Sequence, residues 1–217
     1  MKKALLLISL LFMIGVVVIK KENMTYRQSF LKAFYPAVMS ISKVFSAKSK
    51  VLGNDKNVAP TQSFYNLSFK NIAGEKINMD RFRGKKVLLV NTASDCGFTA
   101  QLTELQQLQN EHPGNLVIIG FPSNDFQDQE KGSNETIAAF CKKNYDVSFL
   151  LAQKSVVVSN KSQSPIFQWL SARQQNGWCS QTPEWNFSKY LVNGQGMLVG
   201  YFGPAISPLS SQLTKKL

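Results

Sequence analysis

Cys96 occupies the position in this sequence that best suits nucleophilic chemistry. It lies in the segment NTASDCGFT (residues 91–99), between an apolar run typical of a buried strand and Thr99, which predicts the start of a helix. Unpaired N–H groups and the dipole at a helix N-terminus favour the thiolate, the reactive form of cysteine. Gly97 allows the chain to turn closely beside the sulfur. We therefore expect an exposed, ionised thiol at the edge of a sheet, although a lone cysteine is more often an inert core residue.

The three cysteines of the chain, Cys96, Cys141 and Cys179, are too few and too scattered to form a disulfide scaffold. No Cys-x-x-Cys pair occurs, and the only histidine of the sequence is His112. A structural zinc site would need a further Cys or His ligand near these residues, so we expect no metal. We expect no cofactor either.

The elements that must position Cys96 follow one another as strand and helix patterns. Continuous apolar runs predict buried strands at residues 86–91 and 115–121. The dipeptide Asn193-Gly194 predicts a tight hairpin between strands at 187–192 and 197–202. The other elements that we expect are a hairpin over 64–69 and 76–79, a strand over 147–151, and helices over 99–112, 134–145, 164–172 and 207–216. This order is typical of the α/β class.

Positive charge is concentrated at the start of the chain. The net charge of +12 divides into +8 for residues 1–60, where ten Lys and Arg face only Glu22 and Asp55, and +4 for residues 61–217. The basic residues directly follow an apolar run, so a juxtamembrane region explains them better than nucleic-acid binding does. We expect no nucleic-acid partner.

Residues 4–19 carry no charge and predict an apolar helix that anchors the chain in a membrane within residues 1–21. They span roughly 24 Å against a hydrocarbon core of about 30 Å, and lysines on both sides can snorkel to make up part of the difference. A cleaved signal peptide is the alternative, but no small-x-small cleavage site directly follows the run. The short leader Lys2-Lys3 favours an extracytoplasmic domain, whereas the basic residues after the run favour a cytoplasmic-facing one.

Residues 22–60 separate this segment from the main domain, which we expect over residues 61–217. Apolar side chains recur at helical spacing among basic residues within 25–49. Such a helix can lie on an anionic membrane surface or pack on the domain, and the sequence leaves both open. The Gly, Asn and Pro content of residues 51–60 indicates a linker.

Four motifs resemble the glutathione peroxidase family in their order and spacing. They are VNTASDCGFT at 90–99, GFPSNDF at 120–126, QE at 129–130 and WNF at 185–187. The resemblance runs from about residue 63 to residue 213 and implies a thioredoxin-like fold, a central mixed sheet flanked by helices. It also implies that Cys96 takes the place of the peroxidatic cysteine or selenocysteine, with Trp185 and Asn186 beside the sulfur. Their N–H groups can donate to a thiolate, which lowers its pKa and stabilises charge as the O–O bond breaks.

Cys141 matches the resolving cysteine of the family members that use thioredoxin. By this resemblance the chain is a thiol peroxidase, in which Cys96 attacks hydrogen peroxide or an organic or lipid hydroperoxide and becomes a sulfenic acid. Cys141 then condenses with it to a disulfide, which a thioredoxin-like protein or glutathione reduces. Cys141 falls on the apolar side of its predicted helix, so a buried thiol without a role is the alternative. Disulfide formation is expected to require local unfolding of the helix at 134–145.

Asp125 departs from the family pattern, in which a glutamine normally completes the catalytic group. A carboxylate in its place removes a donor and adds a negative charge near the thiolate, which raises the pKa of the thiol. Three outcomes are open. Asn124 replaces the missing donor, Asp125 turns away from the sulfur, or the enzyme is slow at neutral pH.

Two other functions are alternatives to the peroxidase. The first is a redox sensor or binding module with weak peroxidase activity, because Asp125 replaces the glutamine. The second is a membrane-anchored thioredoxin-like disulfide reductase. Such a reductase usually needs two close cysteines, but the position three residues after Cys96 is Thr99, which argues against this function. The segment between residues 151 and 185 lacks the insertion that builds the tetramer interface in glutathione-specific relatives, so the resemblance implies a monomer.

Overall fold

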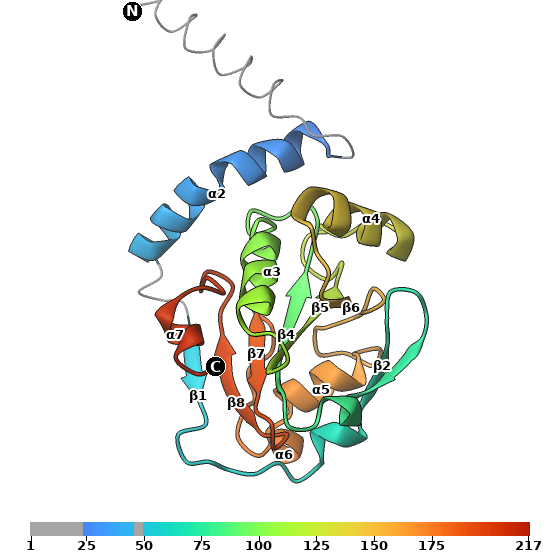
Figure 1. The fold of residues 1–217 in the computed structure, drawn as a ribbon, viewed down its shortest axis with the longest axis vertical. Helices are drawn as coiled ribbons and strands as arrows, with labels where there is room; N and C mark the ends of the chain where they lie inside the picture. The colour runs from blue at the N-terminus through green and yellow to red at the C-terminus, as the bar shows by residue number, and fades with distance from the viewer. Residues whose placement is uncertain (1–23, 46–49) are drawn as a thin grey trace, which may run out of the picture.

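The computed structural model describes residues 24–45 and 50–217, and of residues 41–45 only the backbone. The anchor expected at residues 4–19 therefore lies outside the described residues. Within the part of the chain that is described, no helix combines the length and the apolar content needed to cross a bilayer. The described residues form a six-stranded mixed sheet with helices on both faces, and a separate two-stranded sheet (Figure 1). This arrangement confirms the expected α/β class.

The central sheet is built around two long parallel strands, β4 (Lys86–Thr92) and β5 (Leu116–Pro122). Both were predicted from their apolar runs. The sheet order is β1-β8-β7-β4-β5-β6. Strand β6 is parallel to β5, whereas on the other side of β4 each strand is antiparallel to its neighbour. The outer strands are β6 (Leu150–Leu151), β7 (Lys189–Val192), β8 (Leu198–Phe202) and β1 (Val51–Gly53).

Side chains of β4 alternate between two apolar cores, one on each face of the sheet. Leu88 and Val90 point into one core, and Val87 and Leu89 point into the other, all with at most 1% of their surface exposed. Each buried side chain of this size contributes about 1.5–3 kcal/mol to stability. The first face is covered by α3 (Gln101–Glu111), α4 (Asn134–Tyr145) and α7 (Ser211–Thr214), and the second by α5 (Pro165–Ser171) with the hairpin of β2 (Ser68–Lys70) and β3 (Lys76–Asn78).

Helix α4, which carries Cys141, has local signals at both ends. The Ser133 hydroxyl accepts a hydrogen bond from the backbone N–H of Thr136 at 3.3 Å and caps the first turn. Asp146 ends the helix in the left-handed conformation, with φ 53°, and its N–H bonds to carbonyls of the last turn. The helix is therefore fixed at both termini.

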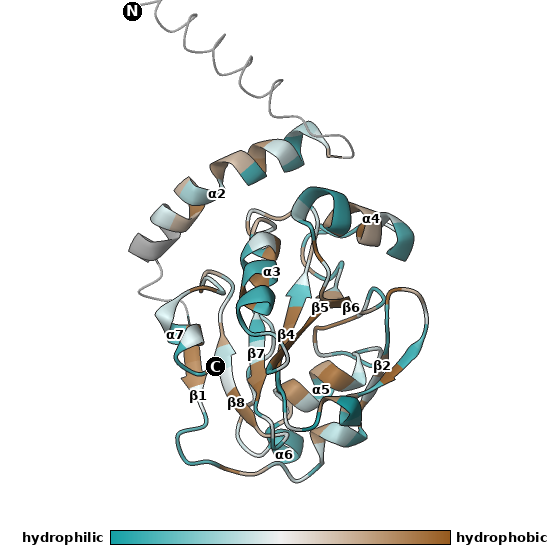
Figure 2. Cartoon of the chain, viewed as in Figure 1, coloured by the Kyte–Doolittle hydropathy of each residue, from teal (hydrophilic) through white to brown (hydrophobic). Residues whose placement is uncertain are grey.

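Helix α2 (Tyr26–Phe45) packs against the domain (Figure 1). Its Lys32 ammonium lies 4.1 Å from the ring centre of Tyr145 and donates a hydrogen bond to the carbonyl of Asn144, at the end of α4. Its Tyr35 hydroxyl donates to the Glu104 carboxylate of α3 at 2.8 Å. Hydrophilic and hydrophobic residues are mixed along the helix (Figure 2), as the helical spacing predicted. Of the two positions expected for this helix, the structure has the one on the domain.

Several expected elements differ from the structure. The strand expected over 147–151 is limited to Leu150–Leu151. The segment expected to be a linker, residues 51–60, begins with β1, which pairs with β8 so that Leu52 lies opposite Tyr201. A three-residue strand is too short to give a readable pattern. The hairpin arm expected over 64–69 starts as a 3₁₀ turn, η2 (Phe64–Asn66), and the last helix starts at Ser211 instead of residue 207. Two further short helices, η3 (Met79–Phe82) and α6 (Arg173–Asn176), complete the elements.

Candidate active site

Cys96 lies in the loop that joins β4 to α3. Its side chain is 1% exposed, so the expectation of an exposed thiol was wrong. The sulfur accepts a hydrogen bond from the backbone N–H of Phe98 at 3.4 Å. Thr99 was expected to cap the helix, but α3 begins at Gln101 and the Thr99 hydroxyl instead accepts from the Cys96 N–H at 3.0 Å and donates to the Ala93 carbonyl at 2.9 Å. These bonds fix the loop around the sulfur.

The pKa of the Cys96 thiol is raised from its ordinary value of 9.0, and burial is the main cause. Hydrogen bonds from the Phe98 N–H and from the side chains of Trp185 and Asn186 lower the pKa, while the negative charge of Asp95 raises it further. The expected preference for thiolate is therefore reversed, because desolvation outweighs the donors. The donors still stabilise the thiolate whenever it forms.

Trp185 and Asn186 reach the sulfur because the end of β4 holds the segment before β7. The Asn91 side chain donates to the Trp185 carbonyl at 3.1 Å and accepts from the Ser188 N–H at 3.0 Å. Between them, Phe187 adopts a positive φ of 68°, an uncommon conformation for a residue other than glycine. Asn186 is fully buried and Trp185 is half-buried. The structure thus brings Cys96, Trp185 and Asn186 together from two distant parts of the chain.

Asp125 does not act on the sulfur. Its carboxylate accepts hydrogen bonds from the backbone N–H groups of Val157 at 2.6 Å and Val158 at 3.1 Å. Of the three outcomes left open by the sequence, the structure has the one in which Asp125 turns away. Asn124 does not replace the donor, because its side chain donates to Asp128 and accepts from the Glu130 N–H.

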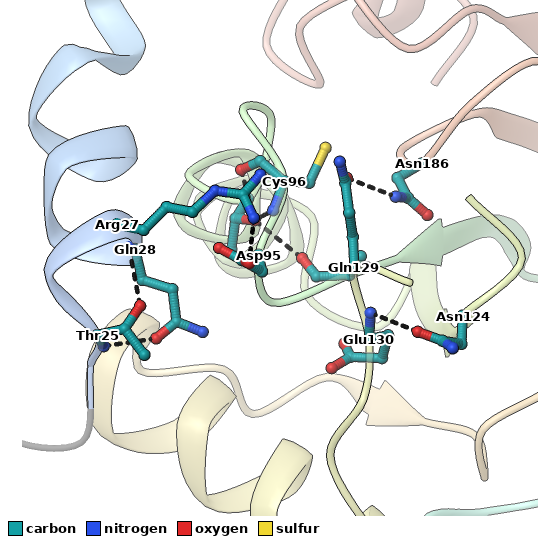
Figure 3. A network of polar contacts seen from close by, with 11 residues as sticks. Thr25, Arg27, Gln28, Asp95, Cys96, Asn124, Gln129, Glu130 and Asn186 are labelled. Carbon is teal, nitrogen blue, oxygen red and sulfur yellow. Dashed lines mark hydrogen bonds and ion pairs between the residues drawn. The ribbon is translucent and has the colours of Figure 1, made fainter. Parts of the chain in front are cut away.

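Gln129 contacts Asn186 and the Cys96 loop, although no motif predicted a role for its side chain. Its side-chain oxygen accepts a hydrogen bond from the Asn186 amide at 3.0 Å, and its carbonyl accepts from the Asp95 N–H at 3.1 Å. Figure 3 shows the Gln129 side chain extending between Cys96 and Asn186. The available signal was its place in the QE motif at 129–130.

Glu130 is a buried carboxyl beside the two cysteine-bearing segments. It is 2% exposed, and burial raises its pKa from 4.5 to about 7 in spite of a hydrogen bond from the Ser94 hydroxyl. Its charge in turn raises the pKa of Cys141. A carboxyl in such a position changes charge near neutral pH.

Cys141 belongs to the same apolar core as Cys96. It is 3% exposed, and burial raises the pKa of its thiol to about 12. Cys179 is buried in the core on the opposite face, where Asn176 holds its backbone by two hydrogen bonds. All three cysteines are free thiols. Among the described residues, no group of three His, Cys, Asp or Glu side chains could hold a metal ion.

A pocket of about 370 Å³ separates the start of α2 from the Cys96 loop and α4. Asp95 and Gln129, which flank Cys96, line one side, and Ile137 and Phe140 of α4 line another. The hollow therefore lies between the two segments that carry Cys96 and Cys141.

Comparison with known proteins assigns the chain to a family. The family profile described as glutathione peroxidase matches residues 64–171. A glutathione peroxidase homologue of Halalkalibacterium halodurans is 40% identical over 148 residues, which are 68% of this chain and 93% of the relative. The chain belongs to the glutathione peroxidase family. A glutathione peroxidase of Lactococcus lactis is 39% identical, over 67% of this chain and 92% of the relative, and a glutathione peroxidase-like peroxiredoxin of Saccharomyces cerevisiae is 38% identical, over 69% and 93%.

Solved structures confirm the thioredoxin-like fold expected of a glutathione peroxidase family member. The apo form of Trgpx superimposes with a TM-score of 0.54 at 27% identity, over 72% of this chain and 93% of that one. The family profile begins at residue 64, so it leaves out the N-terminal region, including α2. Membership of the family identifies the protein as a peroxidase.

Proposed function

We propose that this glutathione peroxidase family member reduces hydroperoxides through the sulfur of Cys96. The observation that carries the proposal is the donor set on that sulfur, formed by the Phe98 N–H at 3.4 Å and the side chains of Trp185 and Asn186. Neutral donors around a buried sulfur favour the thiolate without supplying a competing charge. They also stabilise negative charge that develops nearby during the reaction.

The first step is attack of the Cys96 thiolate on the nearer oxygen of the peroxide. An S–O bond forms as the O–O bond breaks, and the second oxygen leaves with the bonding pair and takes up a proton as water or alcohol. Cys96 is thereby oxidised to the sulfenic acid and the peroxide is reduced. Trp185 and Asn186 are positioned to donate to the sulfur before this step and to the developing oxyanion during it.

The second step joins Cys96 to Cys141. The Cys141 thiol displaces the sulfenic oxygen, a disulfide forms, and water leaves with the thiol proton. Cys141 lies buried in a capped helix, so α4 has to unfold locally before the two sulfurs can bond. An external thiol then reduces the disulfide through a mixed disulfide. We propose a thioredoxin-like dithiol protein for this role, with glutathione as the alternative.

The experiment is a stopped-flow measurement of peroxide consumption with thioredoxin and, separately, with glutathione as electron donor. We expect turnover that Cys96→Ser abolishes and Cys141→Ser reduces with thioredoxin, while the matched control Cys179→Ser keeps its rate. Both hydrogen peroxide and a phospholipid hydroperoxide are tested as substrates. A protein that oxidises once and does not turn over would favour the redox sensor, and reduction of insulin disulfides without peroxide turnover would favour the disulfide reductase.

We also propose a membrane location and a monomeric state for the enzyme. The uncharged run at residues 4–19 supports a membrane tether, with the catalytic domain on the extracytoplasmic side, and the short segment between residues 151 and 185 supports a monomer. Membrane fractionation followed by protease protection tests the tether and its orientation. Release into the soluble fraction by carbonate washing would contradict the tether, and sedimentation in detergent tests the monomer.

A further inference from the structure

The contact between Gln129 and Asn186 lies inside the protein, beside the Cys96 sulfur. Asn186 is fully buried and Gln129 is 8% exposed. The Asn186 amide nitrogen donates to the Gln129 side-chain oxygen at 3.0 Å. The other end of the Asn186 amide, its oxygen, is buried without a hydrogen-bond partner among the residues that the structure describes.

This arrangement sets the direction of the Asn186 amide. An amide nitrogen has two hydrogens, and Gln129 takes one of them, which leaves the second for Cys96. The opposite orientation would turn the amide oxygen, an acceptor, toward the sulfur and toward the Gln129 oxygen. The contact between the two oxygens would be repulsive, and the contact with the sulfur would be repulsive when Cys96 is ionised. With the Gln129 oxygen facing Asn186, as the structure has it, the favoured orientation is the one in which Asn186 donates.

The conformation of the loop from 124 to 130 positions Gln129 beside Asn186. Gln127 and Asp128 both adopt left-handed φ of 52°, and the Asn124 side chain accepts from the Glu130 N–H at 2.9 Å, which closes the loop. The Gln129 carbonyl accepts the N–H of Asp95, the residue before Cys96. One residue thus contacts the loop that carries the sulfur and the amide that donates to it (Figure 3).

We infer that Gln129 is a positioning residue of the peroxidase, which holds the Asn186 amide in its donor orientation. The inference rests on the proposed function, in which Cys96 is the attacking sulfur. Gln129 acts through Asn186, whereas the Asp125 carboxylate accepts hydrogen bonds from the N–H groups of Val157 and Val158. The glutamine that the sequence lacks at position 125 is not replaced at the sulfur itself, but a glutamine four residues later orients one of the donors that remain.

The test is a double-mutant cycle on the full chain. Gln129→Met keeps the length of the side chain and removes the acceptor. We expect the second-order rate constant with hydrogen peroxide to fall about 10- to 100-fold, where the upper value corresponds to the complete loss of one charge-stabilising donor. The rate constant of Asn186→Ala is expected to fall by the same factor or a larger one. In the Asn186→Ala background Gln129→Met should have no further effect, because the group it orients is gone. The pH profile of Cys96 alkylation should move to higher pH in Gln129→Met and not in the matched control Gln127→Met, an exposed position of the same loop.

Two results would overturn the inference. One is an unchanged rate and alkylation profile in Gln129→Met. The other is an equal loss of rate with Asn186 present and with Asn186 removed, which would mean that Gln129 acts independently of it. Thermal unfolding of each variant identifies a purely structural loss, which would lower the melting temperature without moving the alkylation profile. Failure of the wild-type chain to reduce peroxide would count against the proposed function instead, whereas the alkylation profiles would still report on Gln129.

Discussion

The guanidinium of Arg27 lies 2.6 Å from the carboxylate of Asp95, the residue that precedes Cys96. Arg27 belongs to α2, which precedes the region matched by the glutathione peroxidase profile. A positive charge from outside the shared domain thus faces a carboxylate whose negative charge raises the pKa of Cys96. The N-terminal helix is therefore part of the electrostatic environment of the sulfur.

Replacing Arg27 should make Cys96 harder to ionise. In Arg27→Ala the Asp95 charge loses its partner, and the pKa of Cys96 is expected to rise. The two side chains are 61% and 31% exposed, so the pair is worth only about 0.2–1 kcal/mol and the shift should stay below about one pH unit. Thiolate absorbance against pH measures it. Added salt should reduce the difference between the variant and wild type, and a difference that does not respond to salt would contradict the electrostatic cause.

Glu130 should make the stability of the protein depend on pH. Its pKa is raised from 4.5 to about 7 in the folded state, so the folded state holds a proton that the unfolded state loses between these values. The resulting stabilisation is complete below pH 4.5 and is lost as pH rises to about 7, by an amount of about 3 kcal/mol. Urea unfolding of wild type and Glu130→Gln over this range measures the difference. Glu111→Gln, at an exposed glutamate, is the control and should parallel wild type.

The two aspartates near the active site should differ in their effect on Cys96. Asp95→Asn is expected to lower the pKa of the thiol, because the Asp95 charge raises it. Asp125→Ala should leave that pKa unchanged and lower the free energy of unfolding by about 1–3 kcal/mol, because two backbone N–H groups lose a charged acceptor. Alkylation profiles and urea unfolding of both variants provide the comparison. A lower pKa in Asp125→Ala would show that its carboxylate reaches the sulfur.

The cysteines should react with iodoacetamide in a fixed order in the folded protein. Burial raises the pKa of Cys141 to about 12, whereas donors at Cys96 offset part of the shift there. We therefore expect Cys96 to be modified first, at a rate that increases with pH as the thiolate fraction grows. Peptide mass spectrometry at successive times measures the order. In urea the order should disappear, and modification of Cys141 before Cys96 in the folded chain would contradict it.

Most of the fold could be predicted from local patterns. The strands β4 and β5 are continuous apolar runs, and the hairpin of β7 and β8 contains Asn193-Gly194. Both signals depend only on neighbouring residues. Strand β1 could not be predicted in this way, because its three residues become a strand only by pairing with β8, some 150 residues later in the chain.

The features of the site that depend on a sequence motif could be predicted. Those that depend on contacts with residues distant in the sequence could not. The motifs at 90–99 and 185–187 indicated that Cys96, Trp185 and Asn186 meet, and the structure places them together. The direction of the shift in the Cys96 pKa depends on how deeply the sulfur is buried, which a short motif does not indicate. The orientation of Asp125 depends on the N–H groups of Val157 and Val158, and these lie more than thirty residues away.

The packing of α2 has a practical consequence for work on the isolated catalytic domain. A shortened protein that begins at residue 50 would bare the apolar surface now covered by Met24, Tyr35 and Met39. It would also leave Glu104 and Asp95 without the side chains that contact them from this helix. Rates measured on such a fragment would describe an enzyme with altered solubility and a more negative approach to its sulfur, so comparisons with relatives should start from the longer chain.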